Sequence, residues 1–330
     1  MNILVTGGTG FVGINLIPVL LKEGHKVRIF CRNREKAIKL FGNKCELFIG
    51  DITNEYSLKG CCDRIDVVIH MVAKVGNELP DENVLEEFRK VNVYGLKSII
   101  KEAKSANIKR FIYISSIAAM GIVHESIISE KSKCNPYLPY QITKKEGEDV
   151  VLNEYKKNGF PGIVIRTTKV YGYGEREFTY LLLAKLCKRG LFPKVGNNKK
   201  LTSNIYITDL INGLLQSLTH GKFGEVYIIT SKESIGFDDS ARIIAKELNK
   251  KIYFIYIMPW FMILLASLIE HMCIILHKKP LVTKKNVEAT LTDRIYNISK
   301  SESDLDFHPQ ISMENGIKKI IQYYKDVKLI

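Results

Sequence analysis

A phenol, an ammonium group and a hydroxyl occur at spacings that suit proton transfer to or from a substrate oxygen. Tyr140 and Lys144 are four residues apart, which places both side chains on one face of a helix. A tyrosine with its reference pKa of about 10 is a poor base at neutral pH, and a neighbouring lysine cation lowers that pKa. Ser116 ends a β-rich run, and its hydroxyl is suited to orient a substrate oxygen for hydride transfer. These three residues are the predicted catalytic set.

The spacing Tyr-x-x-x-Lys is weak evidence by itself, because it begins at Tyr140, at Tyr296 and at Tyr324. Of these, Tyr140 alone follows a run that ends in a serine pair, Tyr113–Ser116, in the first half of the chain. The combination therefore favours Tyr140 over the other two tyrosines.

A glycine-rich segment, Thr6–Gly13, joins the first predicted strand to the first predicted helix and satisfies G-x-G-x-x-G. Glycine permits the tight turn, lets the backbone approach a pyrophosphate and allows the helix to sit close to the strand. The free N–H groups at the helix start attract phosphates. We therefore expect a bound dinucleotide at this turn. The predicted contacts are Gly7, Gly10, Phe11, Val12 and Gly13.

The residues after the second predicted strand favour NADP over NAD. An acidic residue about 20 positions beyond the glycines binds the ribose 2′-hydroxyl of NAD. Here Arg32 and Arg34 stand in that region, and an arginine fits a 2′-phosphate. The alternative is that both arginines are solvated surface residues. Asp51, just after the third predicted strand, is placed to cap the next turn or to contact the adenine.

Short apolar runs typical of buried strands alternate with helix-patterned stretches through the first half of the chain. The expected strands are Asn2–Thr6, Lys26–Cys31, Cys45–Gly50, Asp66–His70, Arg110–Ser115 and Gly162–Arg166. The expected helices are Phe11–Glu23, Asn83–Ala106 and Leu138–Lys157. This alternation predicts an α/β fold with a Rossmann-type, doubly wound parallel sheet.

We expect residues 1–166 to form the NAD(P)-binding Rossmann domain, including the Ser-Tyr-Lys site. Residues 167–330 are expected to form a smaller, mixed α/β substrate-binding region that is partly interleaved with the first. Expected strands there are Asn204–Ile207 and Glu225–Ile229, and Asp238–Asn249 is an expected helix.

An apolar segment, 252–276, stands apart in the second region. The 18 residues Ile252–Ile269 carry no formal charge, which meets the threshold for considering a transmembrane helix. However, Lys251–Ile257 is strand-like, and a helix over Pro259–Ile269 is too short to span a bilayer. We therefore expect an element that covers the substrate, or an interfacial helix in contact with a membrane.

The net charge, the cysteines and histidines and the first residues of the chain indicate which partners and which compartment to expect. The net charge is +14, but the basic residues occur as scattered doublets, so a dedicated nucleic-acid surface is not expected. Seven cysteines without a Cys-x-x-Cys pair and histidines without ligand spacing predict neither a disulfide framework nor a metal site. The chain enters a strand-like run at once, without a leader, which predicts a cytoplasmic protein.

Taken in order, the motifs resemble those of the extended short-chain dehydrogenase/reductase family, also called the NAD-dependent epimerase/dehydratase superfamily. Besides the glycine turn and the Ser-Tyr-Lys set, the matching segments are Gly50-Asp51, His70–Ala73, Asn92–Gly95, Arg166–Gly172 and Tyr206–Leu210. The resemblance implies that Tyr140 and Lys144 also contact the cofactor. It adds further cofactor contacts at Asp51, Ile52, Ala73 and Asn92.

The tail resembles the 3β-hydroxysteroid dehydrogenase and dihydroflavonol-reductase-like branch, in which such an apolar segment accompanies hydrophobic substrates or a membrane surface. Ser116 is followed by Ile117-Ala118 and not by the Asp-Glu pair of sugar-nucleotide 4,6-dehydratases, which argues against dehydration. Thr167 and Thr208 replace a proline and an aspartate of the family pattern, so the substrate-side loops are expected to differ. The resemblance also implies a homodimer through the helix that carries Tyr140 and the helix before it.

We therefore expect an NAD(P)-dependent oxidoreductase that interconverts a secondary alcohol and a ketone on an apolar small molecule, steroid-, isoprenoid- or flavonoid-like. One alternative is a nucleotide-sugar epimerase with tightly bound NAD, which the positive charge fits and the apolar tail does not. A second alternative is a non-catalytic cofactor-sensing or membrane-assembly protein. The presence of Ser116, Tyr140 and Lys144 together argues against that reading.

Overall fold

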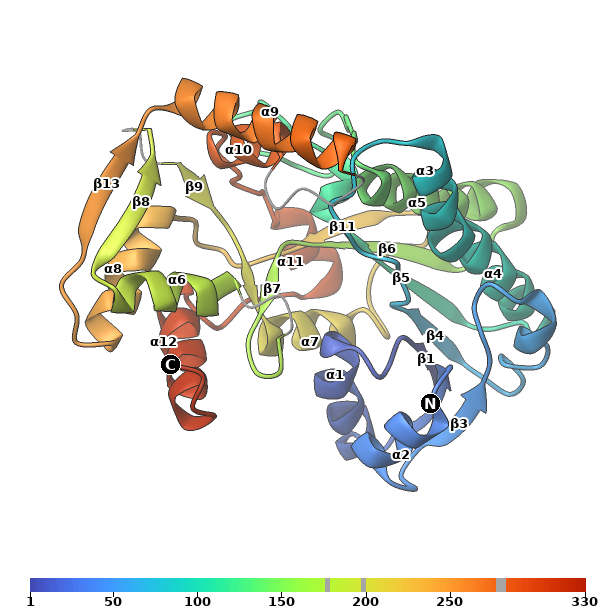
Figure 1. Cartoon of the computed structure of the whole chain (residues 1–330). Coiled ribbons are helices and arrows are strands. Elements are labelled where there is room, and N and C mark those ends of the chain that lie inside the picture. The colour runs from blue at the N-terminus through green and yellow to red at the C-terminus, as the bar shows by residue number, and fades with distance from the viewer. Residues whose placement is uncertain (176–178, 197–199, 277–282) are drawn as a thin grey trace.

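The computed structural model describes residues 1–175, 179–196, 200–276 and 283–330. Within these residues, seven parallel strands form the main sheet in the order β11-β6-β5-β4-β1-β2-β3 (Figure 1). The strands are β1 (Asn2–Thr6), β2 (Lys26–Cys31), β3 (Glu46–Ile49), β4 (Val67–His70), β5 (Arg110–Ser116), β6 (Gly162–Thr167) and β11 (Val226–Ile229). The expected doubly wound parallel sheet is confirmed.

Helices enclose the sheet from both sides (Figure 1). On one side are α3 (Glu82–Arg89), α4 (Gly95–Ser105) and α5 (Pro139–Asn158), and on the other are α1 (Phe11–Lys22), α2 (Arg34–Phe41) and α7 (Ile207–Gln216). In α4, Leu96, Ile99, Ile100 and Ala103 recur at helical spacing and are all buried. This single apolar stripe is what holds α4 on the sheet.

The second region has its own apolar core. Its main elements are α6 (Thr179–Lys188), β8 (Leu191–Val195), α8 (Phe237–Glu247), β13 (Tyr253–Ile257) and α12 (Met313–Asp326). Strands β8 and β13 run parallel, and the side chains of Phe192, Ile244 and Ile320 are buried between the helices. Two short strand pairs complete it, β7 (Val170–Tyr171) with β10 (Ile205–Tyr206) and β9 (Leu201–Thr202) with β12 (Ile235–Gly236).

The chain crosses back to the main sheet after leaving it. Strand β11 pairs with β6, so that Val226 lies beside Val164. Helix α11 (Ser299–Leu305) packs on β11, and the Ser301 hydroxyl donates a hydrogen bond of 2.7 Å to the Ile228 carbonyl. Parts of the second half therefore complete the sheet that the first half begins.

Two expected elements differ in detail. The expected helix Asn83–Ala106 is α3 and α4 joined by a π-helical turn, η2 (Lys90–Tyr94). Such single π turns are common at functional sites, and this one contains Asn92. The expected strand Asn204–Ile207 is only two residues long, because Ile207 already begins α7.

The apolar segment forms strand β13 and then one long helix, α9 (Pro259–Ile275), with α10 (Lys284–Thr290) packed beside it (Figure 1). The helix extends six residues beyond the expected end at Ile269, so it is longer than predicted. Among the described helices, none combines the length and the apolar character needed to cross a membrane.

Candidate active site

The glycine turn between β1 and α1 has the geometry of a phosphate cradle. Gly7 has φ +74°, which favours glycine, and a Cβ on Gly7 would press against the backbone of Met71 and Val72 in the loop that follows β4. A Cβ on Gly13 would overlap the backbone of Gly8. Gly10 is the N-cap residue of α1 and has no side chain that could cap this helix start. The uncapped N–H groups and the closely approachable backbone fit a pyrophosphate.

Of the residues expected near the adenine and its ribose, Arg32 follows β2 and Asp51 follows β3. The Arg32 side chain is 80% exposed, and its Nη1 lies 3.9 Å from Asp51 Oδ2. Asp51 accepts hydrogen bonds from the Thr53 N–H (2.9 Å) and the Thr53 hydroxyl (2.7 Å). These two bonds, helped by the Arg32 charge, hold the pKa of Asp51 below its ordinary value. Asp51 therefore caps its own turn, just before the short helix η1 (Glu55–Leu58).

The predicted contacts Ile52, Ala73 and Asn92 lie around the start of α4 and the loop after β4. Ile52 is buried against Gly95. Asn92 is buried in η2, and its Oδ1 accepts a hydrogen bond from the Lys74 N–H at 2.7 Å. Its Nδ2 donates to the Lys74 carbonyl (3.0 Å) and to Thr143 Oγ1 (2.9 Å). The Asn92 side chain thus joins the loop that carries Ala73 to helix α5.

Ser116 is the last residue of β5, and Tyr140 is the second residue of α5. Ser116 Oγ accepts a hydrogen bond of 3.1 Å from the Ala118 N–H, which caps the short helix η3 (Ile117–Met120). Because this bond uses an oxygen lone pair, the hydroxyl proton of Ser116 is left to donate. Tyr140 is half-buried, and the start of its helix is fixed where Gln141 Oε1 accepts from the Leu138 N–H.

Lys144 lies one turn beyond Tyr140 and is buried. Its Nζ donates a 2.6 Å hydrogen bond to the Ile114 carbonyl and stands 4.7 Å from the centre of the Tyr113 ring. Burial lowers the pKa of Lys144 to about 8, and the negative charge of Glu148 opposes that shift. The ammonium therefore remains mostly charged at neutral pH, yet it is far easier to deprotonate than an exposed lysine.

A buried ion pair that the sequence analysis did not identify supports Lys144. Glu148 accepts hydrogen bonds from Arg166 Nε (2.9 Å) and Nη2 (2.7 Å), and from Ser115 Oγ (2.6 Å). All three side chains are buried. Burial lowers the pKa of Arg166, but its bonds to Glu148 outweigh that effect and raise it. The spacing Lys144-x-x-x-Glu148, one further helical turn, is the sequence signal that would have pointed to Glu148.

Two more buried groups lie beneath the site. His70, the last residue of β4, shares a hydrogen bond of 3.0 Å with Thr6 Oγ1, and its ring stacks against Tyr113. Burial, aided by the charge of Lys144, lowers the pKa of His70 to about 3, so His70 is neutral. The Tyr113 hydroxyl is buried without a hydrogen-bond partner among the described residues. Burial and the charges of Glu148 and Tyr140 raise its pKa well above the ordinary value.

Parallel topology brings the predicted residues to one edge of the sheet. Ser116, His70 and Gly7 lie at or just past the carboxyl ends of β5, β4 and β1, and Arg32 and Asp51 follow β2 and β3. Ligands of doubly wound sheets bind in the crevice outside these strand ends. Sequence-distant candidates thus share one edge.

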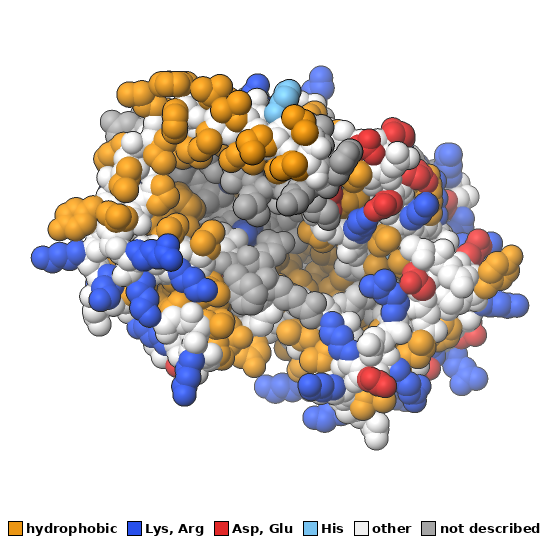
Figure 2. Space-filling view, in the orientation of Figure 1, with side chains coloured by type: hydrophobic (Ala, Val, Ile, Leu, Met, Phe, Trp, Pro, Cys, Tyr) orange, Lys and Arg blue, Asp and Glu red, His pale blue; other side chains and the backbone are white. Residues whose placement is uncertain are grey.

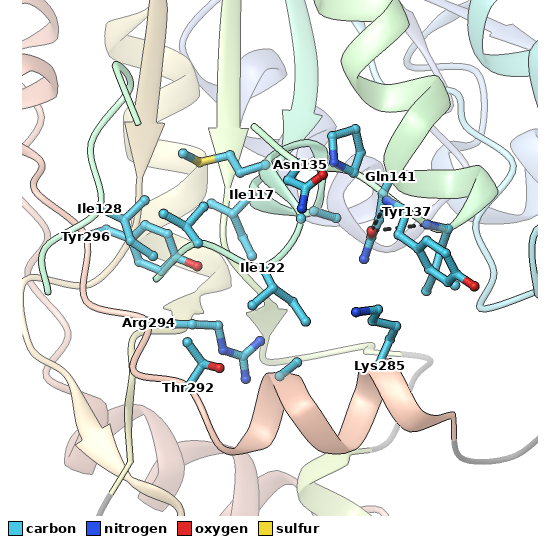
Figure 3. Close-up of a pocket in the computed structure, with 17 residues that line it drawn as sticks. Ile117, Ile122, Ile128, Asn135, Tyr137, Gln141, Lys285, Thr292, Arg294 and Tyr296 are labelled. Carbon is cyan, nitrogen blue, oxygen red and sulfur yellow. Dashed lines mark hydrogen bonds between the residues drawn. The ribbon is translucent and has the colours of Figure 1, made fainter. Parts of the chain in front are cut away.

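A cavity of about 250 Å³ is lined in part by Ile117 and Gln141, which follow Ser116 and Tyr140 in the chain (Figure 3). It is bounded on one side by η3 and the start of α5, and on the other by α10 and the strand-like segment after it. Most of its lining is apolar. The apolar lining includes Ile117, Met120, Ile122, Val123, Ile128 and Leu138.

The comparisons with known proteins agree with this arrangement. The model of the NAD dependent epimerase/dehydratase family matches residues 3–230. A 3-beta-hydroxysteroid dehydrogenase of Mycolicibacterium neoaurum is 26% identical in an alignment of 349 positions, which covers 99% of this chain and 92% of the relative. A dTDP-D-glucose 4,6-dehydratase of Homo sapiens is 27% identical over 343 residues, covering 98% of this chain and 90% of the relative.

Solved structures show the same fold. The crystal structure of UDP-glucuronic acid 4-epimerase from Bacillus cereus in complex with NAD matches with a TM-score of 0.77 at 23% identity, covering 99% of each chain. The resemblance inferred from the motifs is confirmed. With the family model matching most of its length, the chain belongs to the NAD dependent epimerase/dehydratase family, the extended short-chain dehydrogenase/reductase enzymes.

Proposed function

We propose that the protein interconverts a secondary alcohol and a ketone on an apolar substrate, with Ser116, Tyr140 and Lys144 as its catalytic residues. The observation that carries the proposal is the buried Lys144, with its pKa lowered to about 8, one helical turn beyond Tyr140. A buried cation beside a phenol favours the phenolate, which is the form that can accept a proton.

In the oxidising direction, the Tyr140 phenolate removes the proton from the substrate hydroxyl as the carbon is oxidised; in the reducing direction, the phenol returns it. A bound nicotinamide dinucleotide accepts or supplies the hydride. Lys144 stabilises the charged phenolate and contacts the cofactor. Ser116 donates its free hydroxyl proton to the substrate oxygen, which fixes that oxygen near Tyr140.

We further propose that the glycine turn holds the pyrophosphate and that Arg32 favours NADP over NAD. The exposed Arg32 guanidinium lies 3.9 Å from Asp51 Oδ2, and Asp51 Oδ1 accepts both hydrogen bonds from Thr53. An exposed guanidinium in so long an ion pair is available to a 2′-phosphate, which is a stronger partner for it than a 2′-hydroxyl. The remaining proposed contacts are Gly7, Gly10, Phe11, Val12, Gly13, Ile52, Ala73 and Asn92.

The second region is proposed to bind the substrate, and α9 to rest on a membrane surface. Trp260, Leu264, Leu268 and Met272 recur every four residues along α9 and are 62%, 51%, 55% and 60% exposed. Figure 2 shows apolar side chains gathered along this helix. An apolar helix face left in water is unfavourable, and a tryptophan is typical of the lipid interface.

Charge around α9 matches an anionic lipid surface. Lys250 and Lys251 precede β13, Lys284 begins α10, and all three are exposed. Lysines that flank an apolar helix are attracted to acidic headgroups. Because α10 also forms part of the cavity wall, an apolar substrate has a short route from the lipid to the site.

The expected homodimer and the cytoplasmic location stay predictions.

The test is to incubate the purified protein with NADP or NAD and a panel of steroid-like, isoprenoid and flavonoid alcohols and ketones, following cofactor redox change. We expect turnover of at least one apolar substrate, faster with NADP. In a second set of reactions, the protein is incubated with UDP- and dTDP-sugars to test the epimerase alternative. Epimerised sugar without net cofactor turnover would replace the proposal with an epimerase, and tight cofactor binding without any reaction would replace it with a non-catalytic role.

A further inference from the structure

The cavity lined by Ile117 and Gln141, the chain neighbours of Ser116 and Tyr140, contains one positive charge that no described residue neutralises. Among the 17 residues that line it, the charged ones are Lys285 and Arg294, and none is acidic. Lys285 Nζ is paired with Glu288 at 2.7 Å. Arg294 is therefore the cation to explain.

The backbone of Arg294 is held by hydrogen bonds, whereas its guanidinium has no hydrogen-bond partner among the described residues. Its N–H donates to the Leu201 carbonyl (2.8 Å), and its carbonyl accepts from the Ser203 N–H (3.3 Å). Within the described parts of the chain, its guanidinium makes no hydrogen bond or ion pair, and its Nε is buried. The neighbouring Asp293 is not the counter-ion of Arg294, because its carboxylate accepts hydrogen bonds from Lys200 Nζ and from the Leu201 N–H.

A partly buried guanidinium without a partner is unfavourable, because it has lost hydration without gaining a counter-ion. Burial raises the pKa of the lining residue Tyr296 to about 12, and the charge of the nearby Arg294 opposes that rise. Figure 3 shows the Arg294 side chain extending into the cavity below Ile122. The missing partner is therefore expected to come from a ligand.

A second cavity of about 180 Å³ adjoins the first at this point. Thr292 and Arg294 line both cavities. Two further cations on its wall, Lys194 and Lys200, are already paired with Asp238 (3.1 Å) and Asp293 (3.3 Å). Arg294 thus stands where the first cavity meets a second one that has further charged residues on its wall.

We propose that Arg294 binds an oxyanion on the substrate, so that the substrate is an apolar secondary alcohol or ketone carrying one acidic group. The inference rests on the proposed function, because it assigns the far end of the same substrate. A planar guanidinium offers paired N–H donors that match a carboxylate or a sulfate ester. The apolar residues around Ile122 and Met120 hold the body of the molecule, and Arg294 selects its acidic end.

The experiment compares a 3-hydroxysteroid that carries a carboxylate, its sulfate-bearing analogue and the neutral methyl ester of the same acid. For the wild-type protein, we expect kcat/KM for an acidic compound to exceed that for the ester by about tenfold to a hundredfold. R294Q is expected to reduce this ratio to about one, and R294K to leave it in between. The matched control is K285Q, whose lysine lines the same cavity but already has Glu288, and it is expected to keep the ratio.

The carboxylate and sulfate arms identify which oxyanion is preferred. Equal kcat/KM for acids and ester in the wild-type protein, or a ratio unchanged in R294Q, would overturn the inference and leave the proposed function standing. An equal loss for all three compounds in R294Q would assign Arg294 a structural role and overturn it too.

A binding measurement separates this inference from the proposed function. In the Tyr140→Phe protein, which is expected not to turn over, the acidic compound should raise the unfolding temperature, and in Tyr140→Phe/R294Q it should not. Stabilisation that depends on Arg294 without any wild-type turnover would keep the oxyanion site and refute the oxidoreductase. Wild-type turnover without such stabilisation would keep the oxidoreductase and refute the oxyanion site.

Discussion

Lys144 and Glu148 lie one helical turn apart on α5, both buried, and the carboxylate of Glu148 raises the pKa that burial of Lys144 depresses. Glu148 is itself held by two hydrogen bonds from Arg166. The two buried cations thus share one buried anion. The charge state of the proposed catalytic lysine depends on a pair that contacts neither substrate nor cofactor in our account.

Glu148→Gln should therefore change both stability and the pH profile. Removing the carboxylate leaves Arg166 buried without its counter-ion, which is expected to lower the free energy of unfolding by about 3–5 kcal/mol. It also removes the charge that raises the pKa of Lys144, so the loss of turnover at alkaline pH should begin at lower pH than in the wild-type protein. Chemical denaturation and a pH–kcat/KM profile measure the two effects.

The matched control is Glu146→Gln on the same helix, whose carboxylate pairs with the partly exposed Arg89 (2.8 Å). It should lose at most about 1 kcal/mol and keep the wild-type pH profile. A Glu148→Gln protein that is less stable but has an unshifted profile would show that the pair only supports the fold.

Lys144→Met should alter the pH dependence of stability. The folded pKa of Lys144 is about 8 and its ordinary value is 10.5. Between these values the unfolded chain binds more protons than the folded one, so this lysine destabilises below pH 8 and the wild-type protein gains stability as the pH rises towards 10.5. Relative to Lys144→Met, that gain should approach about 3 kcal/mol. Denaturant titrations at several pH values measure it.

Lys145→Met, which removes the surface ion pair of Lys145 with Asp149, is the control and should show no such relative gain. A flat difference between wild type and Lys144→Met across this pH range would contradict the depressed pKa.

Arg32→Glu should exchange the cofactor preference. Removing an exposed guanidinium from the 2′-phosphate is expected to raise the Kd of NADP by about tenfold, while the Kd of NAD changes little. Arg34→Gln provides the comparison, because Arg34 is the neighbouring exposed arginine. Fluorescence titration with both cofactors measures the constants. Equal weakening of NADP and NAD would refute the assignment of Arg32 to the 2′-phosphate.

The exposed face of α9 should bind acidic lipid vesicles. We expect co-sedimentation with phosphatidylcholine vesicles that contain phosphatidylserine, weakened by salt and reduced about tenfold in a Leu264→Asp/Leu268→Asp variant. Ile38→Asp, at an exposed apolar position of α2, is the control and should bind as the wild type does. The alternative is that a second copy covers this face. In that case light scattering would find a dimer for the wild type but not for Leu264→Asp/Leu268→Asp, and the wild type would not bind vesicles.

Local motifs explain why much of the fold and site could be predicted from the sequence. The glycine turn and the Tyr140-Lys144 spacing are each contained in one turn or one helix, so their geometry follows from adjacent residues. The partner of Glu148 lies on β6 and is reached only through tertiary packing. Arg294 lies in an irregular segment after α10, where no periodic pattern marks a site.

The short strands and the end of α9 in the second region could not be predicted from local patterns. Strands β7, β9, β10 and β12 are two residues long, too short for an alternating pattern to be visible. The predicted end of α9 was wrong because Glu270 interrupts the apolar run. In the structure, that carboxylate accepts the Lys284 N–H at 2.7 Å, and the helix continues past it to Ile275.

The most direct test of the proposed mechanism is the turnover of Tyr140→Phe beside Tyr155→Phe, which removes the hydroxyl of an exposed tyrosine on the same helix. Tyr155→Phe should bind NADP as the wild type does, and Tyr140→Phe should lose at most the contact of its hydroxyl with the cofactor. We predict that Tyr140→Phe loses at least about a hundredfold in kcat for the apolar alcohol, since a group that transfers the proton contributes about that much or more, while Tyr155→Phe keeps wild-type kcat. Equal kcat in Tyr140→Phe and the wild type would contradict the assignment of Tyr140 as the proton-transferring residue.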